Sequence, residues 1–318
     1  MQCGVSYFSP RYGFICDLVE NFEIVLATGD IVNANENENS DLWKALRGGG
    51  NNFGIVTAIT LQTFEQGPFW GGQTFHSIDQ RQTIFREHAE LASAHPYDPY
   101  AHFINTIIFL NITQTWFISN SLQYTKSDPP VAVPPEVFKP FVAIPQTPVM
   151  PGAPPNTIRV DNVTAFSREY AANTLYPKRW LFAVISFAPD ADFMEEFFQM
   201  TNSAMEQFFG LDGFQLVLNY QPVPSIMSER KRAVDSLGPI QTEGDLVFIH
   251  WALSYDNNER DSDDVVQDAV KSLFEEAKAK AKKLGVYRSY QQVRLAMPES
   301  YYWNHANILL LPPANLQR

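Results

Sequence analysis

The feature that most constrains this chain is a glycine-rich loop that follows a short predicted helix and leads into a predicted strand. Residues 48–54 read Gly-Gly-Gly-Asn-Asn-Phe-Gly, and residues 41–47 before them carry a helical pattern behind an N-cap signal at 39–41. Residues 55–64 read as a strand. Glycines allow a positive φ or a close approach of the backbone. The residues leave two interpretations open, a contact with a nucleotide or phosphate and a tight helix-to-strand turn.

Several catalytic templates are not met. In a Rossmann fingerprint the loop follows a strand and opens a helix, and here Phe53 stands where the spacing requires glycine. A P-loop lysine after the glycines, a G-x-S-x-G elbow and an H-E-x-x-H motif are all absent. His88 and His95, seven residues apart near one predicted helix face, are interpreted as surface residues. The sequence therefore predicts no metal site and identifies no catalytic residue.

Hydrophobic periodicity predicts an α+β chain with an antiparallel sheet covered by helices on one face. A hairpin is predicted at 22–27 and 31–34. Further strands are predicted at 101–110, 115–124, 180–188, 214–220 and 246–255, and helices at 79–94, 190–209 and 265–284. On the last helix, Glu276 and Lys280 are expected to form an outward i,i+4 pair. The proline-rich stretch 129–155 is predicted to run irregularly over the surface, fixed by apolar residues such as Phe138 and Phe141.

Composition excludes some classes of protein. The formal net charge of −12 argues against a nucleic-acid partner, and no apolar run reaches the ~18 residues of a membrane span. Aromatic residues make up 14% of the chain, which fits either an aromatic-lined ligand cavity or a Phe-rich core. Cys3 and Cys16 allow one disulfide at most. Acceptor triplets for N-glycosylation begin at Asn111 and Asn162 and are compatible with a secreted protein.

Three segments together resemble the berberine-bridge-enzyme-like FAD-linked oxidases, which belong to the vanillyl-alcohol-oxidase-like flavoproteins with a PCMH-type FAD-binding domain. The first resembling segment is Gly4-Val5-Ser6-Tyr7-Phe8-Ser9-Pro10-Arg11-Tyr12-Gly13, followed by Cys16-Asp17. The second is the hairpin beginning at Phe22, and the third is the stretch from Asp41 through the glycine loop to Thr57. The resemblance is specific over residues 4–64 and extends to about residue 284 in element order. The family usually has Asn after the motif's Asp, whereas Leu18 follows Asp17 here.

This resemblance implies a division of the chain. Residues 1–66 would be the rear portion of the FAD-binding domain, residues 67–286 the substrate domain with its antiparallel sheet, and residues 287–318 an atypical tail. Backbone groups of two segments would line part of the FAD pocket, since open N–H groups beside glycine suit a pyrophosphate or adenine. The implied cofactor-binding residues are Gly4, Val5, Ser6, Tyr7, Gly54, Ile55 and Val56.

The resemblance also implies a function. We expect an FAD-dependent oxidoreductase of the oxidase type, in which an alcohol or amine carbon of a small organic molecule gives a hydride to flavin N5 and O2 often reoxidises the flavin. Relatives carry a pyrophosphate-gripping loop and a flavin-bearing histidine before the position of Gly4, so the chain is expected to be truncated at both ends. The alternative hypothesis is a non-catalytic remnant or small-ligand-binding domain. Substrate, flavin linkage, catalytic base, compartment and oligomeric state are not specified by the sequence.

Overall fold

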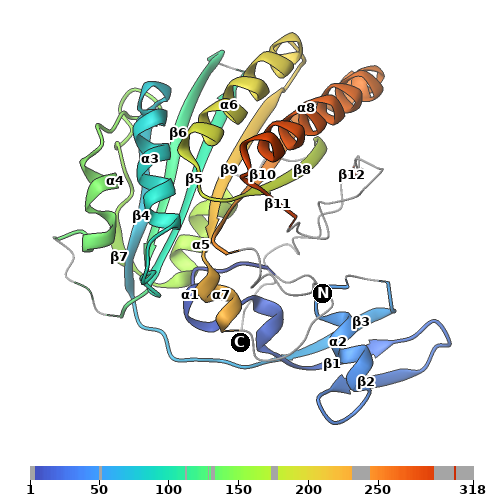
Figure 1. The fold of residues 1–318 in the computed structure, drawn as a ribbon. Helices are drawn as coiled ribbons and strands as arrows, with labels where there is room; N and C mark the ends of the chain where they lie inside the picture. Colours follow the sequence, from blue (N-terminus) through green and yellow to red (C-terminus); the bar gives the residue numbers. More distant parts are fainter. Residues whose placement is uncertain are drawn as a thin grey trace.

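The chain forms two β-sheets, one small and one large. The computed structural model describes residues 4–49, 52–111, 113–127, 129, 133–172, 178–230, 244–289 and 304–305. The small sheet has the strand order β2-β1-β3, and the large sheet has the order β11-β8-β10-β9-β5-β6-β4-β7, with β12 also paired to β8. Figure 1 shows the small sheet, in blue, below the large one. The predicted division between residues 66 and 67 falls in the connection between the two sheets and stays a prediction.

The small sheet confirms the predicted hairpin. Its elements are α1 (Ser9–Tyr12), the 3-10 turn η1 (Ile15–Leu18), β1 (Val19–Val25), β2 (Ile31–Asn35), α2 (Ser40–Leu46) and β3 (Ile55–Leu61). β1 pairs antiparallel with both β2 and β3. The predicted side-chain cap on α2 is wrong, because Asn39 at the N-cap adopts a left-handed conformation without a capping bond. Its amide nitrogen donates instead to the carbonyl of Asn33, which ties the helix start to β2.

The large sheet is antiparallel at every strand pairing that the structure describes. Its strands are β4 (Phe69–Ser77), β5 (Ala101–Leu110), β6 (Thr115–Tyr124), β7 (Arg159–Asp161), β8 (Arg179–Phe187), β9 (Gln215–Val223), β10 (Leu246–Tyr255), β11 (Tyr287–Arg288) and β12 (Asn304–His305). The predicted strands at 101–110, 115–124 and 246–255 are confirmed to the residue. β4, β7 and the two-residue strands were not predicted.

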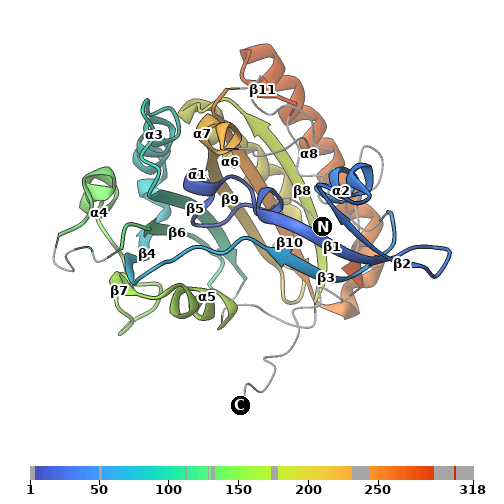
Figure 2. The ribbon, with the colours of Figure 1, turned by 90° about the horizontal axis from the view of Figure 1, so that it is seen from below.

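Helices cover one face of this sheet, as the periodicity predicts. The remaining helices are α3 (Arg81–Ala92), α4 (Lys139–Ala143), α5 (Val163–Ala172), α6 (Ala191–Met205), α7 (Ser225–Glu229) and α8 (Asp263–Leu284), with 3-10 turns η2 (Ile78–Gln80), η3 (Glu136–Phe138), η4 (Glu206–Phe208) and η6 (Asn257–Ser262). Figure 1 shows α3, α6 and α8 side by side over the large sheet. The view from below in Figure 2 shows α1 and the small sheet on the other side of the large sheet from these three helices.

The core lies between the large sheet and its three long helices. Alternate residues of β10, including Ile249, Trp251 and Leu253, are fully buried against the helices, because successive side chains of a strand point to opposite faces. Phe193 and Phe197 of α6 pack into the same cluster. Much of the aromatic content is therefore explained by a Phe-rich core, one of the two interpretations of the composition.

Of the two histidines predicted to lie on the surface, one is buried. His88 is fully buried and lies edge-on against Phe103, with the ring centroids 5.1 Å apart. Its burial lowers the pKa to about 3, and in the described part of the chain neither ring nitrogen has a hydrogen-bond partner. The prediction failed because α3 turns His88 towards the sheet, whereas His95 lies beyond the helix end with 70% of its side chain exposed.

The proline-rich stretch is less irregular than predicted, since it contains η3 and α4. Phe138 and Phe141 are buried in a cluster with Trp70 and Phe103, so the apolar residues fix this stretch as expected. No helix in the described ranges is long and apolar enough to cross a membrane.

Candidate active site

The face of the large sheet opposite the three long helices carries polar side chains where four strands meet. On β5 and β6 the register pairs His102 with Gln123 and Thr106 with Ser119, and these residues alternate with the buried apolar ones. We call one set of polar residues on this face the polar wall; its members are His102 of β5, Ser119, Ser121 and Gln123 of β6, Gln73 of β4 and Gln221 of β9. Because directly paired residues share a face, the register brings them together.

His102 is held in one tautomer by two glutamines. Its Nε2 lies 3.3 Å from the side-chain nitrogen of Gln221, and its Nδ1 lies 3.4 Å from Oε1 of Gln123. An amide nitrogen can only donate, so Gln221 donates to Nε2, and Nδ1 carries the proton that it donates to Gln123. Burial lowers the pKa of His102 to about 4. The imidazole is therefore neutral at pH 7 and acts as a hydrogen-bonding group.

Tyr7, one of the predicted cofactor residues, meets the polar wall. Its ring lies edge-on to His102 with the centroids 5.3 Å apart, and edge-on to Phe69 at 6.3 Å. Burial raises the pKa of Tyr7, and the nearby Tyr170 and Glu169 raise it further. The segment that resembles a flavin-binding motif therefore lies against the polar face of the second sheet.

Helix α5 closes one side of this site. Tyr170 hydrogen-bonds with Ser121 and Gln123, and burial raises its pKa to about 12. Tyr170 is 37% exposed, so the described residues cover it only in part. Glu169 is anchored behind it, because its carboxylate accepts from Gln73 at 3.1 Å and from Arg159 at 2.7 Å.

Apolar contacts hold residues 4–18 on the large sheet. Val5 packs against a cluster whose members come from both parts of the chain, namely Phe14, Cys16, Val184, Val223, Met227, Leu246 and Phe248. The carbonyl of Gly4 accepts from the backbone of Ile15 at 3.0 Å. The backbone N–H of Ser6 donates to Ser9 Oγ at 2.9 Å, so this donor is already used within the segment. Cys16 is disulfide-bonded.

The second predicted segment, Gly54 to Val56, lies at the other end of the small sheet. Gly54 has φ +149, and a Cβ there would come within 2.3 Å of the carbonyl oxygen of Val25, so β1 requires the glycine. Ile55 pairs with Val25, whereas Gly4 bonds to the turn that precedes Val19. At about 3.3 Å per residue, β1 separates the two segments by roughly 20 Å. They therefore do not converge on one point, and their contact with FAD stays a prediction.

A buried ion pair joins the glycine loop to the first segment. Arg47, directly before Gly48, lies 2.8 Å from Asp17, and both side chains are fully buried. Arg47 Nε also donates to the carbonyl of Cys16 at 2.9 Å, and the guanidinium stacks over Trp43. Removing one partner of such a pair leaves an uncompensated buried charge. The pair therefore fixes how the end of α2 sits on η1.

Residues of the open face fit a ligand with hydrogen-bonding groups. On β10, His250 is paired in register with Asn219 of β9, and its Nε2 is buried with no hydrogen-bond partner among the residues that the structure describes. Burial lowers the pKa of His250 to about 4, so the ring is neutral. Phe182 stacks on it at 5.5 Å. A buried nitrogen without a partner among the described residues suits an uncharged hydrogen-bonding group of a ligand.

Three tyrosines of the large sheet lie apart from the polar wall. Tyr220 and Tyr255 are fully buried on the helix-covered face, where their hydroxyls donate to the carbonyl of Met194 and to Asp263. Tyr124 packs beside the cluster that contains Phe138. Among the described residues, no group of three or more His, Cys, Asp or Glu could hold a metal ion. Most of the tail from residue 287 on lies outside the described residues.

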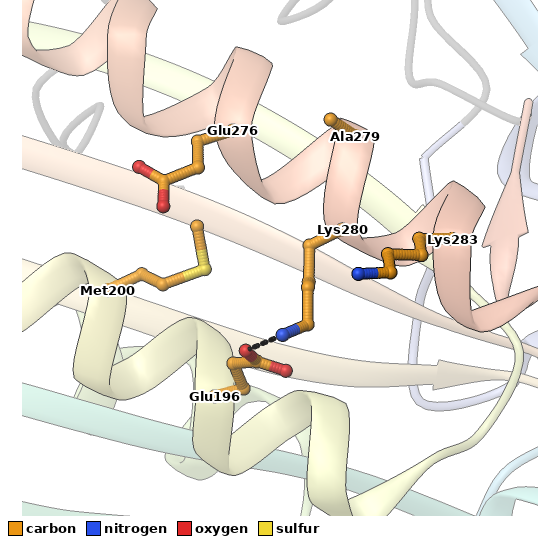
Figure 3. A pocket seen from close by; sticks show the side chains of 6 residues that line it. All are labelled: Glu196, Met200, Glu276, Ala279, Lys280 and Lys283. Atoms are coloured by element: carbon orange, nitrogen blue, oxygen red, sulfur yellow. Dashed lines mark ion pairs between the residues drawn. The ribbon is translucent and has the colours of Figure 1, made fainter.

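A groove of about 270 Å³ lies between α6 and α8, on the helix side of the large sheet (Figure 3). Lys280 pairs there with Glu196 at 2.5 Å, so the predicted pair with Glu276 is not the one that forms. Lys280 faces α6, and its partner is the carboxylate of Glu196 on that helix instead of the carboxylate of Glu276 on its own helix. The groove shares no residue with the polar wall.

The polar wall was missed by the sequence analysis. Strands β5, β6 and β9 were predicted and β4 was not, and the polar positions in the predicted strands were not assigned to a face. The signal was present: His102 and Thr106 alternate with Phe103 and Ile107, and Ser119 and Ser121 alternate with Ile118 and Leu122. In a sheet with helices on one face, such polar alternates identify the open face.

Comparison with solved structures gives the class of fold that the sequence resemblance implied. Solved structures with this fold include a berberine bridge enzyme variant, with TM-score 0.62, 12% identity and coverage of 96% of this chain and 58% of the other. Physcomitrella patens BBE-like 1 matches with TM-score 0.60, 14% identity and coverage of 92% and 60%. The 6-hydroxy-D-nicotine oxidase of Arthrobacter nicotinovorans matches with TM-score 0.57, 16% identity and coverage of 91% and 59%. The fold is thus that of the berberine-bridge-enzyme-like FAD-linked oxidases, as predicted.

Sequence relatives identify the family. The FAD-dependent monooxygenase CTB5 of Cercospora nicotianae is 70% identical over 291 residues, which cover 92% of this chain and 63% of the relative. The FAD-dependent monooxygenase elcE of Phaeosphaeria nodorum is 58% identical, with coverage of 91% and 87%. No family model matches the chain. The chain belongs to the FAD-dependent monooxygenases, a family of oxidoreductases that use FAD. It spans less than two thirds of the length of CTB5.

Proposed function

We propose that this chain provides the substrate-binding sheet and part of the flavin-binding domain of an enzyme that oxidises an alcohol or amine carbon of a small organic molecule. The observation that carries the proposal is the contact between Tyr7, in the flavin-like segment, and His102 of the polar wall. A substrate has to lie between the flavin-binding part and the substrate-binding part of such an enzyme. Tyr7 and the polar wall mark that junction.

FAD, when bound, supplies a hydride acceptor at N5 and can be reoxidised by O2. The residues of the site would bind and orient the substrate. His102, Tyr7 and Tyr170 are neutral at pH 7, because burial lowers the pKa of the histidine and raises that of both tyrosines. Neutral donors and acceptors bind a hydroxyl or amino group without the desolvation cost of a buried charge. Gln123 and Gln221 occupy both ring nitrogens of His102, so the imidazole would position Tyr7, whose ring packs on it, and would not itself bind the substrate.

The names of CTB5 and elcE favour a second candidate function, monooxygenation of the substrate. The two reactions differ in the fate of O2. An oxidase releases hydrogen peroxide and leaves no atom of O2 in the product, whereas a monooxygenase transfers one. Turnover under 18O2, with mass spectrometry of the product and a peroxide assay, distinguishes them.

The test of the proposed site compares two histidines. His102→Leu removes the neutral hydrogen-bonding ring from the polar wall, while His95→Leu removes an exposed ring outside it. We expect His102→Leu to lower kcat/KM for alcohol or amine substrates about 10-fold or more, because it leaves Gln123 and Gln221 without the ring that they hold and removes the ring against which Tyr7 packs. His95→Leu should match the wild type. Equal activity of both variants would remove the polar wall from the site.

The visible absorbance of flavin in the purified protein tests the alternative that this chain is a non-catalytic remnant or a small-ligand-binding domain. A protein that binds FAD neither alone nor with the rest of a longer relative would be a non-catalytic remnant or a small-ligand-binding domain.

A further inference from the structure

Three aromatic side chains form a row on the open face of the large sheet, outside the polar wall. Trp180 and Phe182 are two residues apart on β8, and their ring centroids lie 5.7 Å apart with the planes inclined by 2°. Phe182 also stacks on His250 of β10, with the centroids 5.5 Å apart and the planes inclined by 17°. We call these three residues the aromatic row. All three are half-buried, so each keeps part of its surface open.

The aromatic row begins beside the flavin-like segment. The strand pairing places His250 directly opposite Val184. Val184 is buried in the cluster that Phe14 and its neighbours share with the large sheet. Phe182 and Trp180 follow at alternate positions of β8 and are not members of this cluster. The row therefore runs from the edge of the flavin-like segment outward over the open face.

Polar side chains cross the sheet at the inner end of the row. His250 pairs in register with Asn219 of β9, and Asn219 pairs with Thr106 of β5. The hydroxyl of Thr106 donates to Asn219 Oδ1 at 2.8 Å. The Nε2 of His250 is buried and has no partner in the part of the chain that the structure describes. An unsatisfied hydrogen-bonding atom therefore lies between the aromatic rings and the polar strands.

The charge of this surface restricts the ligand that it can bind. Burial lowers the pKa of His250 to about 4, so the ring is neutral at pH 7 and its Nε2 accepts or donates according to the tautomer. A hydroxyl group can do both. Among the described residues, the open-face positions of β8, β9 and β10 hold no Asp, Glu, Lys or Arg. The surface therefore suits an uncharged ligand better than an anion or a cation.

We infer that the aromatic row binds the substrate as an uncharged, flat aromatic molecule with a hydroxyl group, whose ring packs on Phe182 and whose hydroxyl bonds to Nε2 of His250. The inference rests on the proposed function, because it names the class of substrate that the oxidoreductase would take. A flat ring gains from offset stacking or edge contacts with aromatic neighbours. The hydroxyl satisfies a buried polar atom, which is costly to leave unpaired. The flavin-like segment lies next to this position.

The test is calorimetric titration of the 318-residue protein with two probes that share one carbon skeleton. 2-Naphthol is flat and aromatic, whereas decahydro-2-naphthol carries its hydroxyl on a saturated and puckered ring system. We expect the wild type to bind 2-naphthol about 10-fold or more tightly than decahydro-2-naphthol, because only the aromatic probe can stack. The titration needs neither turnover nor bound flavin.

Variants separate the two contacts of the site. Phe182→Leu and Trp180→Leu each remove one ring of the row and should reduce the preference for the aromatic probe. His250→Phe keeps a ring but removes Nε2, and should weaken the binding of both probes about 5-fold through the lost hydrogen bond. Phe209→Leu is the matched control, since Phe209 is half-buried and stacks on Phe109 at 3.9 Å on the helix-covered side. It should bind as the wild type does, and thermal melts show which variants are folded.

Other outcomes would overturn the inference. These are equal affinity of the wild type for both probes, no binding of 2-naphthol, or binding that neither Phe182→Leu nor Trp180→Leu changes. Tighter binding of cellobiose than of 2-naphthol would also overturn it, because the row would then bind a sugar.

The inference and the proposed function can fail separately. If 2-naphthol binding depends on Phe182 but no alcohol or amine is oxidised, the ligand class stands and the proposed function fails. If His102→Leu lowers kcat/KM as expected but the row variants bind 2-naphthol like the wild type, the proposed function stands and the inference fails.

Discussion

The two sheets of this protein are stabilised in different ways. The large sheet buries one face under α3, α6 and α8, and residues 4–18 and α5 contact parts of the other. The small sheet has one short helix, a core of six buried residues and an outer strand with exposed aliphatic side chains. The difference shows that the large sheet has a core of its own, while the small sheet has a small core that depends on contacts made by its turns and by α2.

The largest expected effect tests the core of the large sheet. Trp251 is fully buried on β10 and meets Phe274 of α8 edge-on at 5.9 Å. Trp251→Ala should cost about 3–5 kcal/mol of unfolding free energy, because it removes a large buried surface and leaves a cavity. Urea unfolding followed by circular dichroism measures it, with Val265→Ala as the exposed control. A loss below about 1 kcal/mol would show that the helix layer is not tightly packed.

A smaller loss is expected at the glycine of the small sheet. Gly54→Val places a side chain where a Cβ would lie 2.3 Å from the carbonyl of Val25, at a positive φ. We expect a cost of about 1–3 kcal/mol from strain, visible as a lower thermal midpoint without any ligand. Gly210→Ala, which meets nothing within 4 Å, is the control. Coincident melts of Gly54→Val and the wild type would show that this turn can relax.

Acid should destabilise the large sheet in particular, because all six histidines follow residue 66. Burial lowers the pKa of His88 from 6.5 to about 3, so the unfolded state binds more protons than the fold between these values. The stability from neutral His88 is present above pH 6.5 and is lost as the pH falls towards 3. Between about pH 6.5 and 5 the loss is roughly 1.5 kcal/mol, and His88→Leu should remove it. Unfolding free energies at both pH values test this; an unchanged pH dependence in the variant contradicts it.

The smallest effect is expected on the open side of β3. Ile59→Thr keeps a β-branched residue at a position that is 39% exposed, so the stability should change by no more than about 0.5 kcal/mol. The same thermal and urea measurements apply. A loss of 2 kcal/mol or more, the scale of a core substitution, would show that Ile59 is already covered, which would remove the contrast between the two sheets.

Much of the fold could be predicted from local pattern. The hairpin of β1 and β2, helix α2 and strands β5, β6 and β10 follow from periodicity and turn residues, which act within a few residues along the chain. The short strand β7 was missed because three residues give no period, and its place depends on pairing with β4. The burial of His88 was missed for a related reason. Helical spacing shows which residues share a face of the helix, but not which face packs against the sheet.

The sequence by itself determined the chemistry of the flavin-like segment and the need for glycine near residue 54. It also determined the alternation that gives the large sheet one apolar face. Only the tertiary structure decided that Tyr7 lies against His102 and that Gln221 and Gln123 hold that histidine from different strands. These residues are between 21 and 119 positions apart in the chain where they bond. Such contacts depend on strand order and register, which local propensity does not encode, because they are set by how the whole sheet buries its apolar face.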